Sequence, residues 1–241
     1  MIISTRINEI MEPTELLKHL LAYAKIDFIM SPNPDDSWLR VYRYDKDWVK
    51  DGHFFSIDNS SGDHIHILFS SFGCIIKGFD HESEICANNK RRGVSHSDCI
   101  AAHDFYKDAP VELVSLVDDP ALQKEQVTFC AWRTIDDAAW HYAPFAVPED
   151  WHDGIDLFLY YAHNLKQHQE WFEENYELAL DTKILLSIYD GSTITSIIVN
   201  SLNPDVTLET ISEGFSDIFA VSPLRPGVWG AKPHDVPFCP S

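Results

Sequence analysis

Apolar residues near the start of the chain repeat at the spacing of a helix. The segment Glu12-Pro13 is followed by a series that recurs every three or four positions: Leu16, Leu17, Leu20, Leu21 and Ala24. Proline and acidic residues are favoured in the first turn of a helix, and this spacing places the apolar side chains on one face. We therefore predict an amphipathic helix of about four turns that begins near residue 13 and ends before the proline-containing residues 31–36.

The residues that follow have patterns typical of strands. Residues 38–44 are rich in aromatic and β-branched side chains, which favours a first strand. Three further strands are predicted at residues 54–57, 64–70 and 74–79, with short polar or glycine-containing segments between them. Strands joined by such short turns form an antiparallel meander. A last strand is predicted at residues 126–132, after a short helix at residues 111–117.

The second half of the chain has mainly helical periodicity. One apolar stripe, spaced mostly by three and four positions, consists of Ile155, Leu157, Phe158, Tyr161, Leu165, His168, Trp171 and Phe172. Apolar residues also recur at 184–186 and 194–202, and a further helix is predicted after residue 206 with Thr207 as its N-cap. Residues 222–241 contain five prolines, so we expect them to lie extended across the surface.

These elements together predict an α+β fold. Residues 1–145 are expected to form an antiparallel sheet with a flanking helix, and residues 146–241 a mainly helical region with a proline-rich tail. The best boundary between them is the segment 140–149, which contains Pro144 and Pro148. Two separate domains and one continuous domain are both compatible with this pattern.

The charge balance narrows the classes of partner. The 241 residues include 38 acidic and 18 basic ones, so the formal net charge is -20 at pH 7. Binding to nucleic acid needs clustered Lys and Arg, so this composition argues against a nucleic-acid partner. An acidic surface serves solubility or attracts a basic protein partner, and both interpretations stay open.

The cysteines and the apolar runs bear on the compartment. The five cysteines, an odd number without a Cys-x-x-Cys pair, do not predict a disulfide framework: Cys74, Cys86, Cys99, Cys130 and Cys239. The first residues lack the features of a signal peptide, and no stretch approaches the roughly 18 apolar residues of a membrane span. We therefore expect a cytoplasmic protein without a membrane partner.

The most informative segment for chemistry is a predicted hairpin that extends from Gly62 to Ser83. Side chains alternate along a strand, so His64 and His66 share one face, and the next strand returns Asp80, His81 and Glu82 to the start of the first. Imidazole and carboxylate groups are the ligands of zinc and other divalent metals in hydrolytic sites. The candidate metal ligands are His64, His66 and His81, and the wider set of binding candidates is Asp63, His64, His66, Lys77, Asp80, His81, Glu82 and Ser83.

The same residues have a structural interpretation, which the sequence favours. Two histidines on one strand face are more often hydrogen-bonded or solvated than metal-bound. After Gly78, Asp80 and Ser83 are expected to cap backbone amides, and Glu82 to pair with a basic residue such as Arg91 or Arg92.

The segment Gly78-Phe79-Asp80-His81-Glu82-Ser83, with residues 72–77 before it, resembles a segment of uncharacterised bacterial cytoplasmic proteins. The similarity covers about a tenth of the chain. It implies a bacterial cytoplasmic origin and carries no activity.

We therefore predict a non-catalytic cytoplasmic binding protein without a cofactor, of the immunity type that neutralises a basic toxin. The alternative is a metal-dependent hydrolase in which His64, His66 and His81 bind zinc or another divalent ion and Asp80 or Glu82 assists. A third interpretation is a subunit of a larger assembly.

Overall fold

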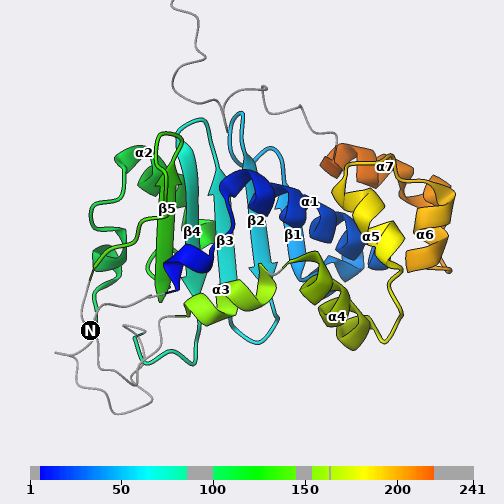
Figure 1. The fold of residues 1–241 in the computed structure, drawn as a ribbon, viewed down its shortest axis with the longest axis horizontal. Helices are drawn as coiled ribbons and strands as arrows, with labels where there is room; N and C mark the ends of the chain where they lie inside the picture. The colour runs from blue at the N-terminus through cyan, green and yellow to red at the C-terminus, as the bar shows by residue number, and fades with distance from the viewer. Residues whose placement is uncertain (1–5, 86–99, 145–153, 163, 220–241) are drawn as a thin grey trace, which may run out of the picture.

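The chain folds around one five-stranded antiparallel sheet, shown in Figure 1. The computed structural model describes residues 6–85, 100–144, 154–162 and 164–219. The strands lie side by side in chain order: β1 (Tyr42–Asp45), β2 (His53–Asp58), β3 (His64–Phe69), β4 (Gly73–Phe79) and β5 (Phe129–Thr134). Helix α1 (Pro13–Met30) packs on the sheet, and the described part of the second half is mostly helical. The predicted α+β class and the antiparallel meander are confirmed.

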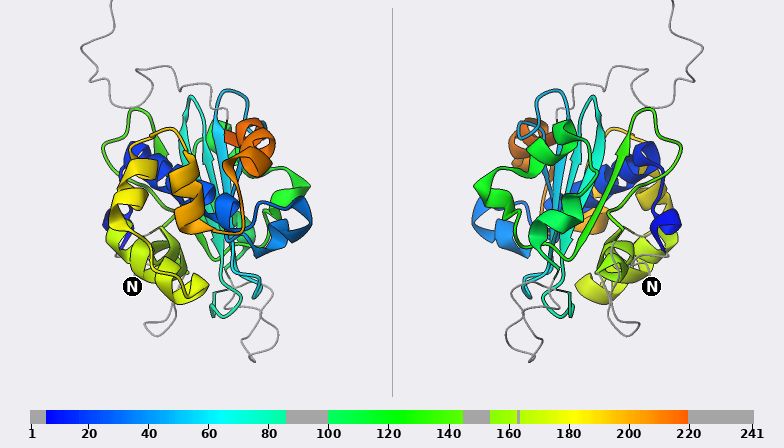
Figure 2. Two further views of the ribbon diagram at one scale, coloured as in Figure 1. Left: turned by 90° about the vertical axis from the view of Figure 1, so that its right-hand side faces the viewer. Right: turned by 90° about the vertical axis from the view of Figure 1, so that its left-hand side faces the viewer.

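The sheet has an apolar core on each face. Along β3, Ile65 and Ile67 belong to the core beneath α1, whereas Leu68 belongs to the core on the opposite face. This is the alternation that the sequence predicts for a strand. The opposite face is covered by short helices: η4 (Ala102–Tyr106), α2 (Val111–Val114), η5 (Ser115–Val117) and η6 (Pro120–Leu122). Figure 2 views the sheet edge-on, with α1 on one side and α2 on the other.

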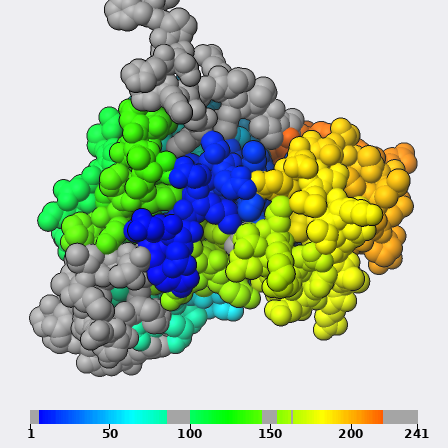
Figure 3. All heavy atoms as spheres, viewed as in Figure 1, coloured from blue at the N-terminus to red at the C-terminus, as the bar shows by residue number. Residues whose placement is uncertain are grey.

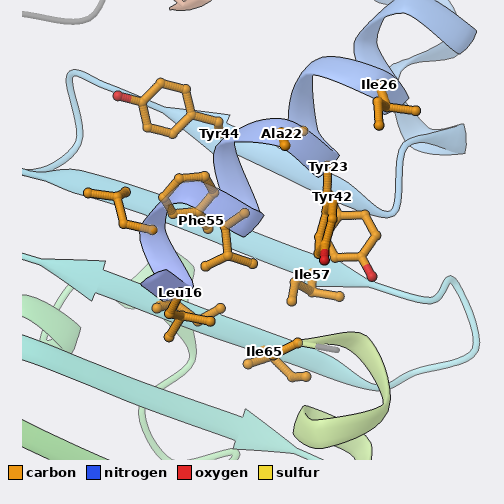
Figure 4. Close-up of a cluster of buried hydrophobic side chains, with 14 of the residues drawn as sticks. Leu16, Ala22, Tyr23, Ile26, Tyr42, Tyr44, Phe55, Ile57 and Ile65 are labelled. Carbon is orange, nitrogen blue, oxygen red and sulfur yellow. The ribbon is translucent and has the colours of Figure 1, made fainter. Parts of the chain in front are cut away.

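Helix α1 is buried more completely than an amphipathic surface helix. It contacts β1 on one side and the helices α5, α6 and α7 of the second half on the others. Figure 4 shows side chains of α1, among them Leu16 and Ile26, above Phe55, Ile57 and Ile65 of the sheet. The apolar residues of α1 therefore extend beyond one stripe because the helix lies between two layers.

The prediction for residues 38–44 is wrong in its first part. Residues Pro34–Leu39 form the 3-10 helix η2, and β1 begins at Tyr42. The side chain of Asn33 accepts a hydrogen bond from the backbone N–H of Asp35, and Pro34 occupies the first helical turn. This cap and the fixed φ of proline outweigh the aromatic content of Trp38 and its neighbours. The last strand also begins later than predicted, at Phe129.

Five helices follow the sheet in the described part of the chain: α3 (Ile155–Tyr161), α4 (Leu165–Tyr176), α5 (Thr182–Tyr189), α6 (Ser196–Leu202) and α7 (Leu208–Phe219). The predicted stripe from 155 to 172 is divided between α3 and α4 because Asn164 starts α4 with a reciprocal capping box to Gln167. Thr207 caps α7 as predicted, since its Oγ1 accepts a hydrogen bond from the N–H of Thr210 over 3.2 Å.

Both predicted regions contribute to the core beneath α1. Leu20 of the first region and Phe172, Leu185 and Val199 of the second belong to the same cluster of buried side chains. The proline-rich segment 222–241 and the pair Arg91 and Arg92 lie outside the described residues. Within the described part of the chain, no helix combines the length and the apolar character needed to span a membrane.

Candidate functional site

The predicted hairpin brings Asp63 and His81 together at one end of the sheet. His64 at the start of β3 pairs with Phe79 at the end of β4, so the residues just outside these strands are neighbours. Asp63 Oδ1 accepts a hydrogen bond from the backbone N–H of His81 over 2.8 Å and lies 2.7 Å from its ring Nδ1. The antiparallel register therefore creates the contact between two residues that are 18 positions apart.

Neighbouring residues hold this pair in place. Asn59 Nδ2 donates a hydrogen bond of 2.7 Å to Asp63 Oδ2, which fixes the second carboxylate oxygen. The ring of His81 lies beside Gly62, whose φ of +104° favours glycine. The backbone N–H of Asp80 donates to Thr128 Oγ1 on the segment before β5.

Glycine is also required at position 154, beside the same cluster. Gly154 has a φ of +77°, and a Cβ on this residue would lie 2.8 Å from Thr128 Oγ1 and 3.2 Å from Asp80 Cβ. The start of α3 thus approaches the cluster so closely that a side chain would collide with it.

The imidazole of His81 lies between two carboxylates. Its Nδ1 faces Asp63, and its Nε2 lies 3.0 Å from Glu82 Oε1. The hydrogen bond to Asp63, with the negative charges of Asp63 and Glu82, raises the pKa of His81. Burial opposes ionisation of Asp63, but hydrogen bonds from His81 and Asn59 outweigh it and lower the pKa of this carboxyl.

Asp63, Asp80 and His81 also form a group with the composition of a metal site. One donor atom from each residue lies within 4.8 Å of the other two. Among the described residues, no other group of three or more His, Cys, Asp or Glu side chains has its donor atoms within this distance of one another.

His64, His66 and Lys77 occupy a different part of the hairpin. Lys77 is fully buried on the sheet face covered by the short helices, opposite His66 in the register. Its Nζ lies 2.9 Å from His64 Nε2 and donates to the carbonyl oxygen of Leu122 over the same distance. Within the described residues, the structure therefore does not bring the predicted ligands His64, His66 and His81 into one group.

Burial controls the charge of these three residues. Removal from water lowers the pKa of Lys77 to about 7, of His64 to about 4 and of His66 to about 3. Positive charge on Lys77 lowers the pKa of both histidines further. Both imidazoles are therefore neutral at pH 7.

The predicted capping roles in residues 80–83 are confirmed for two side chains. Asp80 Oδ1 accepts a hydrogen bond of 2.8 Å from the N–H of Glu82, and the buried Ser83 accepts one of 3.3 Å from the N–H of Ile85. Glu82 contacts His81, and its predicted pairing with Arg91 or Arg92 falls outside the described residues.

Sequence reasoning missed Thr128 and Gly154 because their contacts join distant segments, and it missed Asn59 although Asn59 contacts Asp63 only four positions along the chain. It also missed Asp27, a fully buried carboxylate on α1. The signal for Asp27 is an acidic residue within an apolar run, between Ile26 and Phe28.

Comparisons of the chain with protein-family models, with curated proteins and with solved structures found no match.

Proposed function

We propose that the chain is a non-catalytic cytoplasmic binding protein whose C-terminal helices bind a basic protein, as an immunity protein binds a basic toxin. The observation that carries this proposal is the charge of residues 155–219. They contain eleven acidic residues and two lysines, and all eleven acidic residues are exposed. Figure 3 shows α5, α6 and α7 as one continuous part of the surface.

Intramolecular ion pairs do not account for this excess. Lys166 lies 3.2 Å from Glu170 within α4, and Asp156 pairs with Arg6 near the N-terminus. Among the described residues, the other acidic side chains of 155–219 form no ion pair. Their field is therefore available to attract and orient a positively charged partner.

Helix α7 presents the most regular part of this surface. Glu209, Glu213 and Asp217 follow one another at intervals of four, so they share one exposed face of the helix. Like charges at this spacing reduce helix stability. A basic partner would relieve the repulsion, which supports a binding role for this face.

Exposed apolar side chains accompany the acidic ones on the surface of residues 155–219. Leu186 on α5 is 44% exposed, and Ile197 on α6 is 74% exposed. Protein interfaces combine apolar contacts with a polar or charged rim, and acidic charge around apolar side chains suits a partner with basic and apolar residues.

Charge reversal on α7 tests the proposal. The partner is captured with the full chain at low ionic strength, identified, purified and titrated calorimetrically. Changing Glu209, Glu213 and Asp217 to Lys is expected to weaken binding at least tenfold, and added salt should weaken binding of the native chain.

The matched control changes three exposed acidic residues outside residues 155–219, Glu112, Glu125 and Asp136, to Lys. It alters the net charge equally and should leave most of the affinity. A partner without excess positive charge, or equal losses in both triple variants, would contradict the proposal.

A further inference from the structure

We infer that Asp63, Asp80 and His81 form a binding site for a divalent metal ion of the zinc class. Asp63 comes just before the β3–β4 hairpin, and Asp80 and His81 come just after it, so all three lie at its open end. One donor atom of each lies within 4.8 Å of the others. This inference is independent of the proposed binding surface on residues 155–219, because it concerns other residues and another ligand.

The donor atoms lie close enough together for one ion to contact all three after small side-chain shifts. Asp63 Oδ1 and His81 Nδ1 are 2.7 Å apart. Two ligands that each bind tetrahedral zinc at about 2.0–2.2 Å stand roughly 3.4 Å apart, so these two atoms would separate by about 0.7 Å on binding. The ion would replace the proton shared between these atoms, and a small movement of the Asp80 carboxylate would complete a set of three protein ligands.

The surrounding contacts resemble those that orient metal ligands. A metal-binding histidine usually donates its other ring N–H to a carboxylate, and Glu82 Oε1 lies 3.0 Å from His81 Nε2. Asn59 Nδ2 similarly donates to Asp63 Oδ2, so Oδ1 is directed toward His81. Each of these two ligands is therefore held by a neighbour that would not itself touch the ion.

The site combines a fixed frame with access from solvent. The Asp63 side chain is largely buried, and the β3–β4 register fixes its distance from the chain at His81. The His81 side chain is 40% exposed, so an ion can reach it from water. Three protein ligands leave at least one coordination position for water or another small ligand.

The ligand types favour zinc over magnesium or calcium. Imidazole nitrogen suits zinc and its transition-metal neighbours, whereas magnesium and calcium prefer oxygen ligands throughout. A site made of one imidazole and two carboxylates should therefore bind Zn²⁺ more tightly than Ca²⁺.

The same contacts also describe a purely structural arrangement in which protonated His81 bridges Asp63 and Glu82. The two interpretations differ in whether the native chain takes up an ion. They are separated by metal titration of the full chain, produced without an affinity tag and dialysed against a chelator before Zn²⁺ is added.

We expect one Zn²⁺ per chain at this site, measured by calorimetry and elemental analysis. His81→Ala and Asp80→Asn should each weaken binding at least tenfold, and Glu82→Gln by about 10–100-fold. The control is His141→Ala, because His141 forms a similar exposed pair with Asp137 over 3.4 Å, and this change should leave the affinity unchanged.

A measurement on the native chain complements the variants. Zn²⁺ should shift the side-chain nitrogen signals of His81 more than those of His141 in an NMR titration. The inference is overturned if the native chain takes up no stoichiometric zinc, if the His81 signals do not move, or if Ca²⁺ binds more tightly than Zn²⁺. It is also overturned if folded His81→Ala binds Zn²⁺ as well as the native chain does.

Discussion

The carboxylate of Asp27 on α1 accepts a hydrogen bond of 2.8 Å from the backbone N–H of Tyr42 in β1. Tyr42 belongs to β1, an edge strand whose outward backbone groups have no neighbouring strand among the described residues. The hydroxyl of Tyr176 at the end of α4 donates to the other carboxylate oxygen over 3.0 Å. One fully buried side chain therefore joins α1, the sheet edge and the C-terminal helices.

Asp27 is expected to make stability depend on pH. Burial raises its pKa from 3.8 to about 7, although the hydrogen bonds and the charge of Arg40 oppose this shift. Between these values the folded state binds more protons than the unfolded state, so the free energy of unfolding falls as pH rises. For one proton the slope reaches about 1.4 kcal/mol per pH unit.

Asp27→Asn removes this proton without removing the side chain. Urea denaturation across this pH range should show the variant gaining stability relative to the native chain up to about pH 7, with a constant difference above it. A constant difference across the whole range would contradict the raised pKa.

Tyr176→Phe tests the other contact of Asp27. The change leaves a buried carboxylate oxygen without its hydroxyl donor, which should cost about 1–3 kcal/mol of unfolding free energy. Tyr142→Phe is the control, since Tyr142 is partly buried and should change stability much less. Equal losses in the two variants, measured by urea denaturation, would argue against the Asp27 contact as the cause.

Lys77 should have the opposite pH dependence. Burial lowers its pKa from 10.5 to about 7, so between these values the unfolded state binds the additional proton. The contribution of Lys77 to stability therefore rises with pH in this range and is lost as pH falls through about 7.

Lys77→Met keeps most of the side-chain volume and removes the amine. Its stability relative to the native chain should be highest below about pH 7 and should decline toward higher pH. Lys166→Met, on an exposed lysine, serves as the control and should show no such trend in denaturation experiments. Parallel curves for the two variants would disprove the buried-lysine explanation.

Gly154→Ala and Gly191→Ala separate backbone strain from steric contact. The two glycines have φ values of +77° and +78°, but a Cβ at 154 meets Thr128 and Asp80, whereas a Cβ at 191 has no heavy atom within 4 Å. Both changes should cost about 1 kcal/mol for the left-handed backbone. Gly154→Ala should cost about 1–3 kcal/mol more because of the collision. Equal thermal or urea stability would show that the start of α3 moves away without cost.

Local patterns were sufficient for much of the fold. Strands β2, β3 and β4 could be predicted because alternating side chains and short turns are encoded within a few residues. The start of α1 at Pro13 and the cap of α7 at Thr207 are local in the same sense. The error at the start of the predicted strand 38–44 arose where two local signals competed and the cap at Asn33 prevailed.

The segment that contains the candidate site could be predicted from the sequence, but the residues that this segment contacts could not. The sequence by itself determined that His64 and His66 share a strand face and that residues 80–83 return to the start of the hairpin. It left open which residues His81 would join, because the register and the position of Gly154 are set by contacts between distant parts of the chain.

Tertiary structure alone decided the environment of Lys77 and Asp27. Lys77 is a charged residue in a strand whose alternation also fits an exposed position, whereas Asp27 lies within an apolar run; each becomes fully buried because another segment covers it. The segment that ends at Leu122 covers Lys77, and α4 covers Asp27. The sequence therefore determined the elements and their apolar faces, whereas the packing of those faces determined which polar groups lose water and change their pKa.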